Sequence, residues 1–127
     1  MLTLTFSLVA CKGGDDGIRK LTGEDKYLLI TVGEDAEGNL LSLMQQKAAE
    51  GEFAFTEAGG MITSINGVEN PADWSYCWML YTTDSDYAVK EYGQVKLGKT
   101  VYTSAALGAE ALPVKGGEKY LWVYVAF

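Results

Sequence analysis

Histidine is absent from the 127-residue sequence. This absence excludes a serine or cysteine nucleophile activated by a histidine base, and it excludes zinc sites built on imidazole ligands. The closest acidic pairs lie in a linker or in expected loops, where solvated charge is the simpler interpretation; they are Asp15-Asp16, Glu34-Asp35 and Asp84 with Asp86. The segment 84–86 also carries only part of the ligand spacing of a calcium loop. The sequence therefore predicts a protein that is not an enzyme, with no catalytic residue and no metal site.

Basic residues are scarce as well, with ten lysines and arginines against seventeen acidic residues and a net charge of -7. Such a surface repels phosphate backbones and anionic lipid head groups, which argues against a nucleic-acid partner. After Cys11 there is no apolar run of the length that a transmembrane helix needs. Attachment to a membrane, if it occurs, would therefore come from acyl chains alone.

The segment Leu8-Val9-Ala10-Cys11 has the pattern of a bacterial lipobox, in which an apolar run and small residues precede a cysteine that becomes acylated. On this interpretation residues 1–10 are a lipoprotein signal peptide, truncated or misassigned at its start because it lacks a basic region. Cys11 would carry the lipid, and residues 11–25 would form a flexible tether. The alternative is a first strand, since Leu2, Leu4 and Phe6 alternate with polar residues. The lipobox predicts an extracytoplasmic protein anchored to the bacterial cell membrane.

Cysteine is rare, and the two residues allow two interpretations. If Cys11 is acylated, Cys77 has no partner and is expected to be a small buried hydrophobic residue. The alternative is a Cys11 to Cys77 disulfide, which would gain little by fixing a flexible tether.

Hydrophobic periodicity and glycine punctuation predict an α+β fold, with one helix packed on a mostly antiparallel sheet. The helix is expected over 40–50, with Asn39 as its N-cap and Gly51 after its end. Strands are expected over 26–32, 52–57, 61–65, 74–82 and 120–127, with short strands between 94 and 101. Asn66-Gly67 is typical of a tight turn, and 83–93 and 104–113 are expected to be loops. The strand over 74–82 is non-polar on both faces, which indicates a central strand covered on both sides or a strand with one face kept for a ligand.

Several of these segments together resemble the transcobalamin-like C-terminal domain family. The resemblance covers about residues 26–127 and is carried by Gly60-Met61-Ile62-Thr63-Ser64-Ile65-Asn66-Gly67, by Cys77-Trp78-Met79-Leu80-Tyr81, and by Gly116-Gly117-Glu118 before Tyr120-Leu121-Trp122-Val123-Tyr124. It implies a β-grasp-like sheet with one helix. In animal vitamin B12 carriers the equivalent domain closes over cobalamin held on a separate helical domain. The resemblance thus implies cobalamin as a possible ligand and a helical partner domain, although Thr82-Thr83-Asp84 departs from the turn that the family often has here.

The aromatic residues are the remaining candidates for a binding surface, because tyrosine and tryptophan pair an apolar body with a polar tip. Most of them, including Trp122, are expected to lie in the core. The residues expected to be exposed to a ligand are Trp78, Tyr81, Tyr102, Thr103 and Ser104. The sequence therefore predicts a lipid-anchored ligand-binding module. The alternative is a surface or adhesion module that binds carbohydrate or protein and is unrelated to cobalamin.

Overall fold

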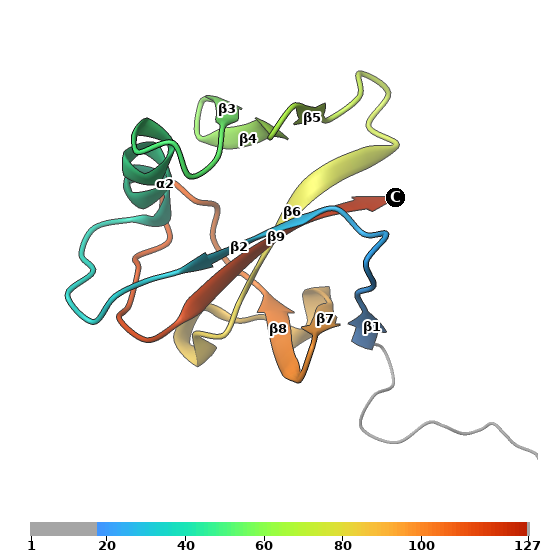
Figure 1. Ribbon diagram of the computed structural model, residues 1–127. Coiled ribbons are helices and arrows are strands. Elements are labelled where there is room, and N and C mark those ends of the chain that lie inside the picture. The colour runs from blue at the N-terminus through green and yellow to red at the C-terminus, as the bar shows by residue number, and fades with distance from the viewer. Residues whose placement is uncertain (1–17, 127) are drawn as a thin grey trace, which may run out of the picture.

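A six-stranded sheet is the frame of the computed structural model, which describes residues 18–126 (Figure 1). Its strands in spatial order are β1 (Ile18–Lys20), β7 (Gln94–Leu97), β8 (Thr100–Ser104), β6 (Tyr76–Thr82), β9 (Lys119–Ala126) and β2 (Tyr27–Thr31). β1 and β7 are parallel, and the other neighbouring pairs are antiparallel. With its one α-helix, the described part of the chain has the expected α+β fold.

The helix α2 (Leu40–Ala49) begins where the capping pattern predicts. The side chain of Asn39 accepts a hydrogen bond of 2.8 Å from the backbone N–H of Ser42, which satisfies one of the free donors of the first turn. Gly51 follows the C-cap with a φ of 87°, a backbone conformation that favours glycine. Leu40 and Met44 are buried against the large sheet, so the helix packs through one face.

A small sheet of β3 (Phe55–Ala58), β4 (Met61–Ile65) and β5 (Val68–Glu69) lies beside α2 on the same face of the large sheet (Figure 1). Asn66 and Gly67, with φ of 51° and 85°, form the tight turn between β4 and β5. The side chain of Asn66 also accepts a hydrogen bond of 3.0 Å from the N–H of Ala54. The turn predicted at Asn66-Gly67 is confirmed, and it closes a short hairpin.

Two hydrophobic clusters cover the two faces of the large sheet. The first contains Leu40 and Met44 of α2, Ile62 and Ile65 of β4, and the inward residues Trp78, Leu80, Tyr120 and Trp122. The second contains Leu21, Tyr81, Val95, Tyr102, Leu121 and Val123. β6 meets β8 over only two residue pairs, and β7 and β8 then fold over the second face, where Val95 and Tyr102 pack. β6 is therefore a central strand covered on both sides, the first of the two alternatives for its sequence.

The predicted tether over 11–25 is wrong for its second half. β1 pairs in register with β7, from Ile18 opposite Gln94 to Lys20 opposite Lys96, and Leu21 is buried in the second cluster. Two apolar residues in a charged, glycine-containing segment are too short a pattern to show periodicity, so the sequence did not indicate a strand. The segment 1–10 expected to be a signal peptide, Cys11 and residues 12–17 lie outside the described residues. Among residues 18–126, no helix has the length and apolar character needed to cross a membrane.

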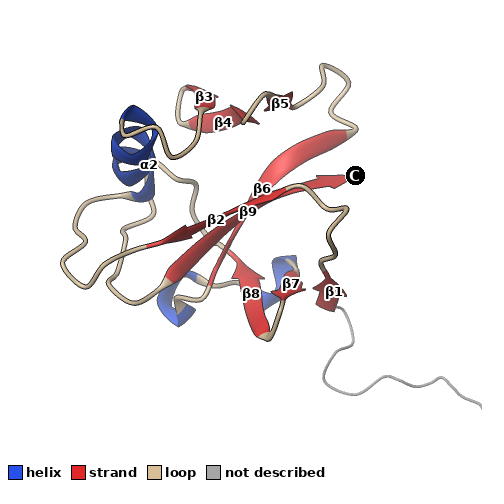
Figure 2. Ribbon diagram, in the orientation of Figure 1, coloured by secondary structure: helices blue, strands red, loops and turns tan. Residues whose placement is uncertain are grey.

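The loop expected over 83–93 contains two short 3₁₀ turns, η2 (Ser85–Tyr87) and η3 (Lys90–Tyr92), drawn as helices in Figure 2. Asp84 is buried and caps the first of them by accepting a hydrogen bond of 3.0 Å from the N–H of Asp86. Of the two carboxylates that resembled part of a calcium loop, that of Asp84 therefore shapes a turn, and that of Asp86 lies 3.7 Å from the ammonium group of Lys115.

Candidate functional site

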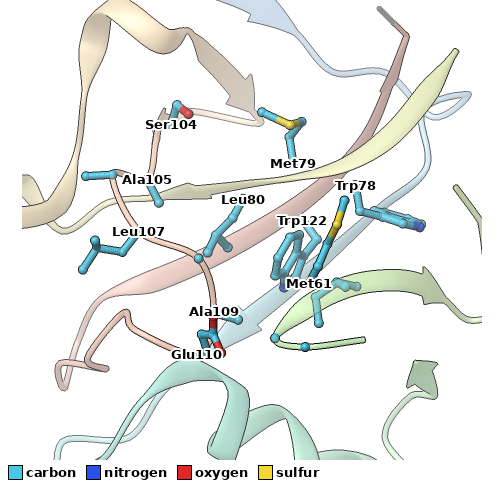
Figure 3. Close-up of a pocket in the computed structure, with 15 residues that line it drawn as sticks. Met61, Trp78, Met79, Leu80, Ser104, Ala105, Leu107, Ala109, Glu110 and Trp122 are labelled. Atoms are coloured by element: carbon cyan, nitrogen blue, oxygen red, sulfur yellow. The ribbon is translucent and has the colours of Figure 1, made fainter. Parts of the chain in front are cut away.

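A cavity of about 370 Å³ opens between the two sheets (Figure 3). One wall is the turn from β3 into β4, a second is the middle of β6 and β9, and a third is the loop that follows β8. The residues around it are Gly59, Gly60, Met61, Ile62, Trp78, Met79, Leu80, Trp122 and the segment 104–110. Its volume lies at the lower end of the range for small-molecule sites in proteins.

Most of the side chains that line the cavity are apolar, and Ser104 and Glu110 are the polar exceptions. Figure 3 shows Leu80 and Trp122 reaching from the large sheet toward the cavity, with Met61 of β4 across from them. Leu80 and Trp122 are buried, whereas Met61 is 46% exposed and stands at the opening. Met79 points to the opposite side of β6 from Leu80 (Figure 3), so only part of that residue borders the cavity. A ligand here would meet two rigid side chains and one flexible thioether, which adapts well to irregular shapes.

The two tryptophans are held in place by their indole N–H groups. Trp122 donates to the sulfur of Met44 at 3.3 Å, and Trp78 donates to the carbonyl oxygen of Val68 at 2.8 Å. Both indoles therefore have partners within the protein, and neither presents an unpaired donor to the cavity. The wall formed by these rings is fixed before any ligand arrives.

The loop over 105–110 lines the cavity with small residues. Its backbone is anchored at both ends: Ala105 donates to the carbonyl of Leu80 at 3.0 Å, and the carbonyl of Ala109 accepts from Leu41 at 3.0 Å. Small side chains on an anchored backbone leave space that larger residues would fill. These two bonds therefore fix the loop as one wall of the cavity.

Gly60 allows the loop and the β3–β4 turn to approach each other. It has a φ of 90°, and a β-carbon at this position would collide with the carboxylate of Glu110. Its N–H donates to the side chain of Glu57 at 2.9 Å. Glycine is thus required by the backbone conformation, whereas the contact is with the end of a flexible side chain that could move aside.

Four of the five residues expected to be exposed to a ligand are buried. Trp78 and Ser104 border the cavity, whereas Tyr81 and Tyr102 lie in the second hydrophobic cluster. Thr103 is half-buried, and its hydroxyl accepts a hydrogen bond of 3.0 Å from Gln94. The structure therefore does not bring the five residues together at one exposed site.

These residues are buried because of tertiary contacts that the local sequence does not show. Ser104 was expected to begin a loop, but it ends β8, and the hairpin of β7 and β8 covers the face that carries Tyr81. Alternation along β6 shows that both faces are apolar, but it cannot show what covers each face. The expected burial of Trp122 is confirmed.

Sequence reasoning missed Met61 and the loop over 105–110 as cavity residues. A signal was present, because the segment 104–113 was expected to be a loop and yet has only one charged residue, Glu110. Loops that run over a surface are usually polar, so an apolar loop indicates either burial or contact with a ligand.

Cys77 is a buried free thiol, as expected for a residue without a disulfide partner. Burial raises the pKa of the Cys77 thiol above its usual value. Its sulfur lies 3.5 Å from that of Met79. A thiol that stays protonated at neutral pH is a poor nucleophile, so this group belongs to the packing of the sheet. Within residues 18–126, no three acidic or cysteine side chains gather in a way that could hold a metal ion.

Comparisons of the chain with protein-family models, with curated proteins and with solved structures found no match. The function is therefore inferred from the sequence pattern and from the geometry described above.

Proposed function

We propose that the protein is a lipid-anchored, extracytoplasmic module that binds the apolar part of a small-molecule ligand in the cavity between β4, β6, β9 and the loop over 105–110. The observation that carries the proposal is the cavity itself, about 370 Å³ in volume, with Leu80 and Trp122 on one side and the exposed Met61 at its opening. An apolar cavity with a fixed wall and a flexible residue at its mouth is the usual design of a small-molecule site.

The anchor in this proposal is Cys11. The residues Leu8-Val9-Ala10 before it fit the pattern of a lipobox, and a surface with a net charge of -7 offers no electrostatic attraction to anionic lipids. Several acyl chains on one cysteine hold a protein firmly on a bilayer without a basic patch.

A corrinoid is the ligand that the resemblance to transcobalamin-like domains suggests, and the same resemblance implies a β-grasp-like sheet. A whole corrinoid is larger than the cavity, so it would insert one edge and lie across the opening, against Met61 and the exposed Leu107. The rest of the molecule would remain available to a helical partner domain. Contact would be made by apolar packing and backbone polar groups, because the chain has no histidine to ligate cobalt.

Isothermal titration of the full chain carrying Cys11→Ser with cobalamin and with cobinamide tests this proposal. We expect saturable heat, and we expect Met61→Glu to weaken binding by about tenfold or more, because it places a charge at an apolar opening. Tyr92→Ala is the matched control, since Tyr92 is 70% exposed and lies outside the cavity lining.

Binding of the dye 1-anilinonaphthalene-8-sulfonate, an aromatic ring system with one sulfonate group, tests the cavity independently of the corrinoid. Suppose that dye fluorescence rises with the wild type and is lower with Met61→Glu, while neither corrinoid gives heat. This result would support the cavity as a binding site and would refute a corrinoid as its ligand. Absence of both signals would reject the proposed site.

A further inference from the structure

A second hollow lies at the far end of β6 and β9, away from the cavity. Its volume is about 530 Å³, and it is bordered by Tyr76, Tyr124 and a segment that leads from β1 toward β2. That segment contributes Arg19, Glu24, Asp25 and Lys26. The hollow shares no residue with the cavity described above.

An aromatic shelf of Tyr76 and Tyr124 forms one side of this hollow. The two rings are stacked, with centroids 5.1 Å apart and planes 13° from parallel. Tyr124 is held in position, because its hydroxyl donates a hydrogen bond of 2.7 Å to the carbonyl of Glu69 and its ring packs against Trp78. Tyr76 remains 43% exposed. A ring that is exposed but already held in position loses little entropy when a ligand packs on it.

The polar side of the hollow combines donors and acceptors. Arg19 and Asp25 form an ion pair, and Asp25 also accepts a hydrogen bond of 2.8 Å from the N–H of Thr22. The ammonium group of Lys26 lies 5.9 Å from the centroid of the Tyr124 ring. With Glu24, the hollow has two cationic and two anionic side chains, so its own charges cancel.

This combination selects a class of ligand. An anion or a cation would meet a repelling group beside every attracting one, and the net charge of -7 adds further repulsion for anions. A neutral polyhydroxylated ring can use both kinds of group, because its hydroxyls donate to carboxylates and accept from guanidinium and ammonium groups. Its C–H face can pack on an aromatic ring.

We propose that this hollow is a binding site for one pyranose ring of a neutral glycan, with Tyr76 as the platform and with Arg19 and Asp25 as hydrogen-bonding partners.

The test uses the full chain carrying Cys11→Ser and soluble hexasaccharides of β1,4-glucose, β1,4-N-acetylglucosamine, α1,4-glucose and α1,6-mannose. Binding is measured by isothermal titration at millimolar sugar. We expect at least one hexasaccharide to bind, Tyr76→Ala to weaken it by about tenfold or more, and Tyr76→Phe, which keeps the ring, to stay within about threefold of the wild type.

Tyr92→Ala is the control for the loss of an exposed tyrosine outside the hollow and should bind as the wild type does. Thermal melts of each variant show whether a loss of binding reflects unfolding. Failure of all four hexasaccharides to bind overturns the proposal, and so does equal binding by Tyr76→Ala and the wild type. Sugar binding that is lost in Met61→Glu and kept in Tyr76→Ala would place the glycan in the cavity and refute this site.

Discussion

Replacement of Trp78 by alanine should come close to unfolding the protein, although this residue was expected from the sequence to be exposed. Trp78 is 7% exposed, packs against Tyr124 with ring centroids 5.1 Å apart, and donates a hydrogen bond to the carbonyl of Val68. Truncation of a buried tryptophan costs about 3–5 kcal/mol. Loss of the partner of a half-buried carbonyl adds about 1 kcal/mol. The sum is comparable with the whole stability of a small domain, about 5–15 kcal/mol.

Two further variants serve for comparison with Trp78→Ala. Trp78→Phe keeps an aromatic ring but loses the hydrogen bond and part of the buried area, so we expect a loss of about 1–2 kcal/mol. Trp74→Gly removes an exposed ring and places glycine where φ is 61°, so we expect no loss and a gain of up to about 1 kcal/mol.

Urea denaturation followed by far-ultraviolet circular dichroism measures all three variants without relying on tryptophan fluorescence. The midpoint should fall in the order Trp74→Gly, wild type, Trp78→Phe, Trp78→Ala. A midpoint for Trp78→Ala equal to that of the wild type would show that this side chain is not part of the core. Such a result would support the prediction from the sequence that Trp78 is exposed.

Gly116→Ala should destabilise the fold by about 1–3 kcal/mol, because the new β-carbon would lie 2.7 Å from backbone atoms of the loop after β2. The control Gly33→Ala, whose β-carbon would enter open space, should leave the midpoint of the same urea titration nearly unchanged. Equal midpoints would refute the close approach of the two loops. Cys11→Ser should move the protein from the membrane fraction to the soluble fraction of a bacterial host, and equal incorporation of labelled fatty acid by both forms would refute the lipobox. Burial raises the pKa of Cys77 and of Tyr120 above their values in the unfolded chain, so stability is complete below those values and falls as the pH rises beyond about 9. With no histidine to titrate, the melting temperature should be level from about pH 6 to 8.5, and a decline that begins near pH 7 would contradict this assignment.

Local features of the fold were predictable because their causes are local. Asn39 caps α2 through a bond to a residue three positions away, and Gly67 adopts the positive φ that its turn requires. Alternation in 74–82 and 120–127 identified the two central strands, because every second residue packs into the same cluster.

Features that depend on distant partners were not predictable. β1 is held by β7, more than seventy residues later in the chain, and its own three residues carry no strand signal. Burial of Tyr81 depends on the hairpin of β7 and β8, which covers the second face of the sheet. The cavity arises because the loop over 105–110 is anchored on both β6 and α2, which is a property of the assembled fold.

The pairing of β1 with β7 determines how far the domain can stand from a bilayer. Ile18 is already part of the sheet, so only residues 12–17 separate Cys11 from the folded unit. A fully extended chain from Cys11 to Ile18 covers at most about 25 Å. With Cys11 carrying the lipid as proposed, the domain works within one molecular diameter of the membrane surface. Any partner that shares its ligand must therefore approach the membrane as well. Insertion of further residues into 12–17 would let the domain reach ligands farther from the membrane without changing its affinity for them.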